Sequence, residues 1–200
     1  MIVARITDQN KNRNAKTTGS SKLKGYECWF PLLSASFSFT SESSTEESLP
    51  ASDPSQARGR PKKKDRPQNV VECSKPIDVA TSDLMYLSVF DKLKDRQGTS
   101  KEPDPLAADI HFLEVASGSL EASKKTGPVP YLKVALEEVT LESWALEGSG
   151  DERPSESFQL KFEKIAIQYI AYDGEGNMLP TTARGFSQTE LTNWIPADMK

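Results

Sequence analysis

Two long stretches in the last third of the chain alternate apolar and polar residues. They cover residues 131–145 and 157–171, and the polar segment 147–154 lies between them. A period of two residues predicts β-strands that bury one face. If Leu136 pairs with Ile165 in an antiparallel ladder, apolar residues stand opposite apolar residues along both stretches. The sequence therefore predicts one long hairpin.

The alternation changes phase once in each stretch, at Glu137-Glu138 and at Glu163-Lys164. Two explanations fit this change. The hairpin can bury one face along half of its length and the opposite face along the rest, so that it touches two different surfaces. Alternatively, a β-bulge in each strand bends the hairpin around a barrel. Under the first explanation, the second apolar face meets either the helix or a neighbouring subunit, and its candidate contact residues are Val139, Leu141, Phe158 and Leu160.

Shorter apolar patterns predict more strands before the hairpin. They cover residues 2–7, 25–39, 70–74 and 108–115, and the last of these is apolar on both faces, as in a central strand. After the hairpin, the tail from Asp173 onward carries apolar residues for a last strand or a clasp. We therefore expect a mainly β fold, an antiparallel β-barrel or a tightly curved sandwich, with one α-helix packed on it.

The one helix is predicted at about residues 82–97. Thr81 or Ser82 can serve as its N-cap, and basic residues suit its last turns. Its apolar residues form a stripe at helical spacing that we expect to pack against the core. The stripe consists of Tyr86, Val89, Phe90 and Leu93.

The composition changes sharply at residues 41–68, which are rich in Ser, Glu, Pro and Asp and then in basic residues. Such a segment buries too little apolar surface to fold alone, so we expect a mobile insertion in a single domain that spans residues 1–200. Part of it resembles the AT-hook, an arm that binds the minor groove of AT-rich DNA. Its residues are Arg58, Gly59, Arg60, Pro61, Lys62, Lys63 and Lys64.

This basic run is a candidate contact with DNA or with an acidic partner, and the plain alternative is a solubilising loop. A DNA-associated β-barrel protein is therefore the second functional hypothesis. The formal net charge of the whole chain is −4, which argues against general nucleic-acid binding by the domain.

Candidate catalytic residues are scarce. The single histidine, His111, lies inside a strand pattern, where a structural role is expected, and neither a Ser-His-Asp nor a Cys-His set can be assembled without it. The cysteines and the histidine do not have metal-binding spacing. We therefore expect no enzyme, no cofactor and no metal. Cys28 and Cys73 fit a reducing cytosol, Cys28 is expected to be a small core residue, and whether the two pair stays open.

The first residues contain no apolar run of signal-peptide length, and the most apolar stretch, 26–39, is too short and too polar to span a bilayer. We expect no membrane contact and no use of the general secretory route.

From Cys73 onward, the order of elements resembles the hemolysin-coregulated protein (Hcp) family of type VI secretion systems. Residues 75–84 resemble the strand-to-helix junction of that family, where a Lys, an Asp and a Ser precede the single helix. Residues 131–139 resemble the strand that follows. Residues 154–169 are similar to the Pro-x-Glu, strand, Lys-Ile, Tyr pattern of the family. The N-terminal strands match mainly in position, and the insertion at 41–68 is longer than expected for the family.

The resemblance implies a small β-barrel with one helix that assembles into a six-membered ring. Rings stack into a tube, which a contractile sheath expels, and family members also bind effector proteins in the lumen. The implied partners are copies of the chain itself and the sheath, spike and effector proteins. The implied location is the cytoplasm before firing and then the outside of the cell, without a signal peptide. A head-to-tail ring needs two complementary patches on each subunit.

Overall fold

The structure is a computed structural model that describes residues 1–9, 15–39, 69–96, 105–114, 128–174 and 177–199. For residues 90–96 it describes the backbone only. The strands are β1 Ile2–Asp8, β2 Phe30–Leu32, β3 Ser34–Ser38, β4 Val70–Pro76, β5 Leu106–Glu114, β6 Val129–Glu147, β7 Ser155–Lys161, β8 Lys164–Tyr169, β9 Ala183–Ser187 and β10 Thr192–Asn193. The helix α1 covers Thr81–Arg96, and a 3-10 helix covers Ala197–Met199.

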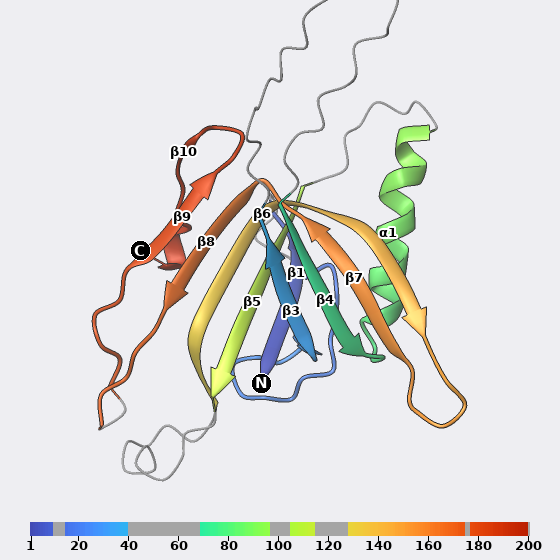
Figure 1. Cartoon of the computed structure of the whole chain (residues 1–200), viewed down its shortest axis with the longest axis horizontal. Coiled ribbons are helices and arrows are strands. Elements are labelled where there is room, and N and C mark those ends of the chain that lie inside the picture. The colour runs from blue at the N-terminus through green and yellow to red at the C-terminus, as the bar shows by residue number, and fades with distance from the viewer. Residues whose placement is uncertain (10–14, 40–68, 97–104, 115–127, 175–176, 200) are drawn as a thin grey trace, which may run out of the picture.

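All strand pairs are antiparallel, and they form two sheets that share β6 (Figure 1). The long sheet has the order β10-β9-β8-β6-β5-β1-β2. The short sheet consists of β3, β4, β7 and the C-terminal half of β6. The predicted central strand is confirmed, because β5 lies between β1 and β6.

The chain passes between the two sheets at Leu33, which separates β2 from β3. The strand β2 pairs with β1 in the long sheet, and β3 pairs with β4 in the short sheet. The N–H of Leu33 donates to the carbonyl oxygen of Ser74 at 2.8 Å. The predicted class, mainly β and antiparallel with one helix, is confirmed. In the part of the chain that the structure describes, the sheet is open rather than a continuously paired barrel.

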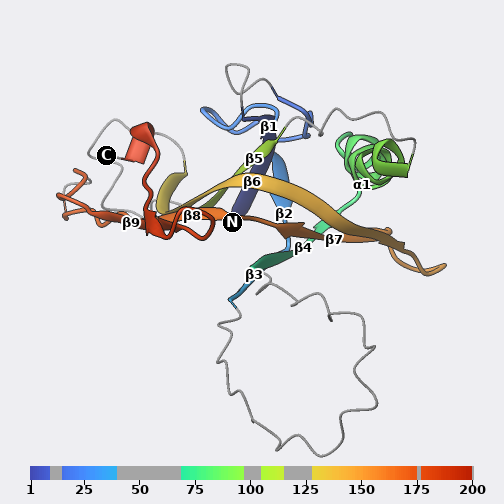
Figure 2. The ribbon, with the colours of Figure 1, turned by 90° about the horizontal axis from the view of Figure 1, so that it is seen from above.

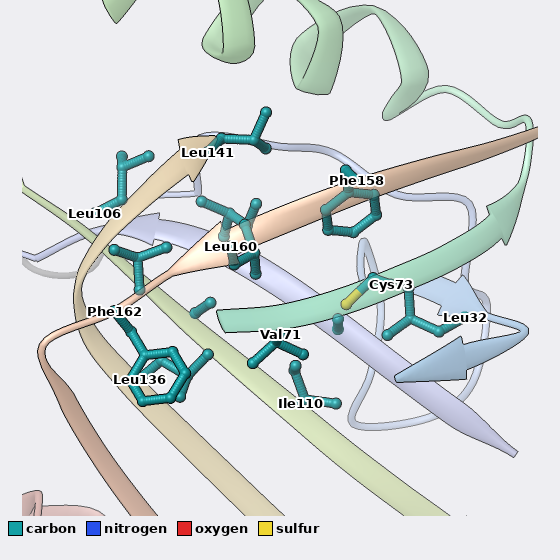
Figure 3. Close-up of a cluster of buried hydrophobic side chains, with 14 of the residues drawn as sticks. Leu32, Val71, Cys73, Leu106, Ile110, Leu136, Leu141, Phe158, Leu160 and Phe162 are labelled. Atoms are coloured by element: carbon teal, nitrogen blue, oxygen red, sulfur yellow. The ribbon is translucent and has the colours of Figure 1, made fainter. Parts of the chain in front are cut away.

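The hydrophobic core lies between the two sheets and under α1, and Figure 3 shows Leu136, Leu141, Phe158 and Leu160 as members of one buried cluster. The phase change in β6 is a β-bulge. Glu138 has a φ of 53°, and the register between β5 and β6 shifts beside it. The bulge reverses which alternate residues point to one side of the strand. Apolar residues before and after it therefore enter the same core. The structure favours the bulge explanation over a hairpin with two separate buried surfaces.

The helix α1 covers the core with a different face from the predicted one. Ala80, Leu84 and Leu87 pack against the core, whereas Tyr86 and Val89 are exposed to solvent. The predicted packing of the stripe is therefore wrong for Tyr86 and Val89, and the side chains of Phe90 and Leu93 lie outside the described residues. The stripe has helical spacing, but Leu84 and Leu87 have it too, and the spacing alone does not tell which face meets a sheet.

Two further layers cover parts of the long sheet (Figure 2). The segment 15–29 lies over β1 and β5, where Tyr26 and Trp29 pack on Val3 and Leu113. This segment precedes β2, so the strand predicted at 25–39 forms only from Phe30 onward.

The second layer is the C-terminal segment 194–199, which lies over β8 and β9. Trp194, Ile195 and Met199 pack on the alanines of these strands. The approach is close at Gly185, where a Cβ atom would lie 2.3 Å from the carbonyl oxygen of Trp194. The tail therefore forms both the last strands and a clasp, where the sequence predicts one or the other.

The two cysteines are free thiols in different environments. Cys73 is buried in the core, and burial raises the pKa of its thiol to about 12. Cys28 is exposed and has a φ of 66°, so the expectation that it is a core residue is wrong.

Candidate functional site

A cluster of buried charges joins β4, β7 and the start of α1. Lys75, the penultimate residue of β4, has a side chain that is 0% exposed. Its Nζ atom forms ion pairs with Glu156 of β7 and with Asp78, the latter at 2.7 Å. It also donates to the carbonyl oxygen of Pro76 at 2.9 Å. Lys75 therefore has a partner for each of its three N–H donors.

Both carboxylates of the cluster accept further hydrogen bonds. Glu156 accepts one from the Thr81 hydroxyl at 2.7 Å and one from the Trp144 indole N–H at 2.5 Å. Asp78 accepts the Ala80 N–H at 2.9 Å, which caps the first turn of α1. The backbone N–H and the hydroxyl of Ser20 also donate to Asp78, at 3.1 and 2.9 Å.

The electrostatics of Asp78 follow from these contacts. Burial by itself would raise the pKa of its carboxyl group, but the hydrogen bonds from Lys75 and Ser20 outweigh burial and hold the pKa below its ordinary value. The carboxylate is therefore charged at neutral pH and pairs with Lys75.

This arrangement indicates a structural junction rather than a reaction centre. Each charged group already has several partners, and the cluster ties two strands, the helix and the segment 15–29 together. A buried charge whose partner is removed costs several kcal/mol, so the cluster allows one arrangement of these elements and penalises others. Lys75 and Glu156 are distant in sequence and belong to two separate motifs of the Hcp resemblance; the structure brings the motifs into contact.

Sequence reasoning did not identify this pair, although a signal for it exists. Glu156 shares the period-two face of Phe158 and Leu160, and Lys75 shares the face of Cys73. A single acid and a single base on two core-facing strand patterns indicate that the two side chains meet.

The single histidine lies under the segment 15–29. Its Nδ1 is 3.1 Å from the Tyr26 hydroxyl, and its ring centroid is 4.8 Å from that of Trp29. Burial, followed by the positive charges of Lys133 and Arg5, lowers the pKa of His111 to about 3. His111 is therefore neutral at pH 7 and packs among aromatic rings, in agreement with the structural role expected from the sequence.

The structure corrects the predicted subunit contact. Val139, Leu141, Phe158 and Leu160 belong to the core of their own chain, where they are 1–4% exposed. Such side chains offer no surface to another subunit. The prediction followed from the idea that the hairpin buries two different surfaces, and the bulge at Glu138 removes that need. A subunit contact has to use other residues.

The remaining sequence predictions concern the basic insertion, metal binding and membrane spans. The AT-hook-like run at residues 58–64 and the insertion at 41–68 lie outside the described residues. Among residues that are described, the side chains form no cluster of metal-ligating groups. Over the same ranges, no helix has the length and apolar character that a membrane span requires.

Comparison of the fold with solved structures identifies similar chains over nearly the full length. One is described as a type six secretion system protein; it is 17% identical, the match covers 97% of this chain and 100% of that one, and the TM-score is 0.58. Hcp1 from Salmonella typhimurium is 13% identical, with 96% and 99% covered and a TM-score of 0.58. Hcp1 from E. coli EAEC 042 is 13% identical, with 94% and 97% covered and a TM-score of 0.58.

No protein-family model matches the chain, and no curated protein does. The likeness is therefore one of fold. The chain has the fold of Hcp proteins, which confirms the mainly β, antiparallel architecture with one helix that the sequence predicts.

Proposed function

We propose that this chain is a structural subunit of a type VI secretion tube. Copies of the chain assemble into rings, rings stack into a tube, and the tube is exported by the contractile apparatus without a signal peptide. Effector proteins bind inside the ring, and the sheath and spike are the other partners. The role is structural and involves no catalysis.

The observation that carries this proposal is the extent of the fold match. The three most informative neighbours are described as type VI secretion or Hcp proteins, and the matches cover 94–97% of this chain and 97–100% of theirs. Because identities of 13–17% are low, the shared feature is the arrangement of strands and helix rather than any local motif. A fold supports a function by analogy, so assembly has to be measured directly.

The test is the solution mass of the purified chain by light scattering behind a sizing column, followed by negative-stain imaging. We expect a mass of about six chains and ring-shaped particles. A monomer over a wide range of concentrations would contradict the proposal.

Export is tested separately in a bacterium that carries a type VI apparatus. We expect the chain to appear in the medium and to disappear from it when the sheath is deleted. A cytoplasmic protein that is absent from the medium serves as the control for cell lysis.

A further inference from the structure

Residues 19–29 form a loop whose two ends are bonded to each other, and we call this loop the flap. The Gly19 N–H donates to the carbonyl oxygen of Cys28 at 2.7 Å, and the Ser21 N–H donates to that of Trp29 at 2.9 Å. The Cys28 N–H donates back to the carbonyl oxygen of Ser21 at 3.2 Å. Because its ends meet, the flap projects from one point of the chain and can leave the sheet without pulling on its neighbours.

The flap rests on the sheet through two buried side chains, those of Tyr26 and Trp29. They pack on Val3 of β1 and Leu113 of β5 in a cluster that is separate from the main core. Beneath the flap, β5 is paired with β1 on one side and with β6 on the other, and the opposite face of these strands lies in the main core. Release of the flap therefore leaves the sheet and the core in place, which is the condition for local opening.

His111 of β5 lies against both rings of the flap. Its ring centroid is 4.8 Å from that of Trp29 and 5.6 Å from that of Tyr26. Its Nδ1 atom is 3.1 Å from the Tyr26 hydroxyl. The histidine is therefore part of the surface on which the flap rests, and a charge on its ring would alter the contacts that hold the flap.

Charged and titratable groups surround His111 on every element that packs there. They are Tyr26 of the flap, Arg5 of β1, Asp109 of β5, Lys133 of β6 and Asp198 of the C-terminal segment. Lys133 stands directly opposite His111 in the ladder between β5 and β6. Burial and the two cations outweigh Asp198, so a proton on the ring is disfavoured while the flap is closed.

We propose that the flap is an acid-released cover, which detaches from β1 and β5 when His111 takes up a proton. In the open form the imidazole reaches water, where its charge is solvated and the two cations are screened. Opening also uncovers Val3 and Leu113, so that an apolar strip appears on the sheet. This inference goes beyond the proposed function, because it concerns one copy of the chain and does not depend on assembly.

The flap stays tethered at both ends while it opens. At the first end, the N–H and the hydroxyl of Ser20 donate to Asp78. The low pKa of Asp78 keeps this acceptor charged as the pH falls. At the last end, the chain enters β2 at Phe30, which is fully buried and pairs with Ala4. Release is therefore reversible, and the rings return to their places when the pH rises.

Hydrogen exchange followed by mass spectrometry between pH 6.5 and pH 4 measures the opening. The pKa of His111 is about 3 with the flap closed and has its ordinary value of 6.5 when the ring is exposed. Between these values the open form binds a proton that the closed form does not, so the open population rises as the pH falls, by about tenfold per pH unit.

We expect the protection factors of the flap amides to fall by this factor once they are corrected for the intrinsic pH dependence of exchange. The bonds within the flap are too few to protect these amides after it has left the sheet.

Urea separates local opening from unfolding of the whole chain. Opening of the flap exposes little surface, so low concentrations of urea should hardly change the protection of its amides. The same concentrations should lower the protection of β5, which is lost only on global unfolding. Equal protection and equal urea dependence in the flap and in β5 would overturn the proposal.

Two variants test the role of the histidine. His111→Gln removes the titrating group and should make flap protection independent of pH. Lys133→Met removes the cation opposite the ring, so it should raise the pKa of His111 in the closed form, which the NMR signal of the single histidine reports directly. The acid-induced loss of protection should then level off at a higher pH.

Lys161→Met is the matched control, because Lys161 is a half-buried cation of β7, a strand that the flap does not cover. It should behave like the unmodified chain. An unchanged pH slope in His111→Gln would overturn the proposal, and so would a Lys133→Met chain that behaves like Lys161→Met.

Discussion

The long sheet is covered differently along its width. Its middle, formed by β1, β5 and the first half of β6, has the main core on one face and the segment 15–29 on the other. Its end, formed by β8 and β9, has the C-terminal clasp on one face, while Ile167, Tyr169 and Phe186 on the other are exposed. Both parts have the same antiparallel ladders and the same kind of strand residues.

The difference teaches that the described residues bury both faces of the sheet in its middle but only one face at its end. In the middle, apolar side chains are buried by the chain itself and contribute to the stability of one copy. At the end, apolar side chains on one face stay partly exposed among the described residues, so they contribute less to the stability of one copy. Variants matched between the two parts can test this distinction.

The largest contrast is expected between a buried cation in β4 of the short sheet and an exposed cation in β9 at the end of the long sheet. Lys75→Met leaves Glu156 and Asp78 without their buried counter-charge, which should lower the free energy of unfolding by about 4 kcal/mol. Arg184→Met removes an exposed cation from β9 and should change this free energy by less than about 0.5 kcal/mol. Urea unfolding of monomeric samples measures both. Similar losses for the two variants would mean that the cluster is not the buried ion network described above.

A matched pair of isoleucines probes the apolar contribution. Ile110 in β5 is fully buried, whereas Ile167 in β8 is partly exposed. Ile110→Ala should lower the free energy of unfolding by about 3 kcal/mol because it opens a cavity. Ile167→Ala should cost less than about 1 kcal/mol, because its side chain is already partly exposed. The comparison would fail if Ile167→Ala destabilised the monomer as strongly as Ile110→Ala.

The burial of His111 under the segment 15–29 predicts that the free energy of unfolding depends on pH. The folded chain holds the pKa of His111 at about 3, below the ordinary value of 6.5. Between these values the unfolded chain binds a proton that the folded chain does not, so stability falls as the pH falls from 6.5 toward 3.

For a single group of this kind the loss is about 2 kcal/mol between pH 6 and pH 4. The measurement is urea unfolding at several pH values. His111→Gln should flatten the curve in this window, and curves that stay parallel would contradict the assignment.

A further effect is expected at the clasp. Gly185→Ala would push a Cβ against backbone atoms of Trp194 and of the neighbouring strand β8, so the clasp or the strand must shift, at a cost of roughly 1–3 kcal/mol. Hydrogen exchange should accelerate in the C-terminal segment and stay unchanged in β5. Gly150→Ala is the control, because a Cβ there meets open space. Unchanged exchange in the Gly185→Ala variant would show that the clasp does not depend on this close approach.

The sequence by itself determined the strands, the helix and the register of the hairpin. Period-two alternation depends on neighbouring residues alone, and the predicted pairs Leu136 with Ile165 and Leu141 with Leu160 are present. The extent of α1 was predicted to within one residue, but the predicted N-cap, Thr81 or Ser82, was wrong because Asp78 caps the first turn. Even Lys75 and Glu156 carried a signal, since each is a charge on an apolar strand face.

The tertiary structure decided which apolar faces are buried within one copy. Val139 and Leu141 have the pattern of an external face, yet the bulge at Glu138 turns them into the core. Val89 has the pattern of a core residue, yet α1 packs through Leu84. The physical reason is that an apolar pattern predicts only that one face of an element is buried. What it packs against depends on segments far away in the sequence, whose positions only the folded chain sets.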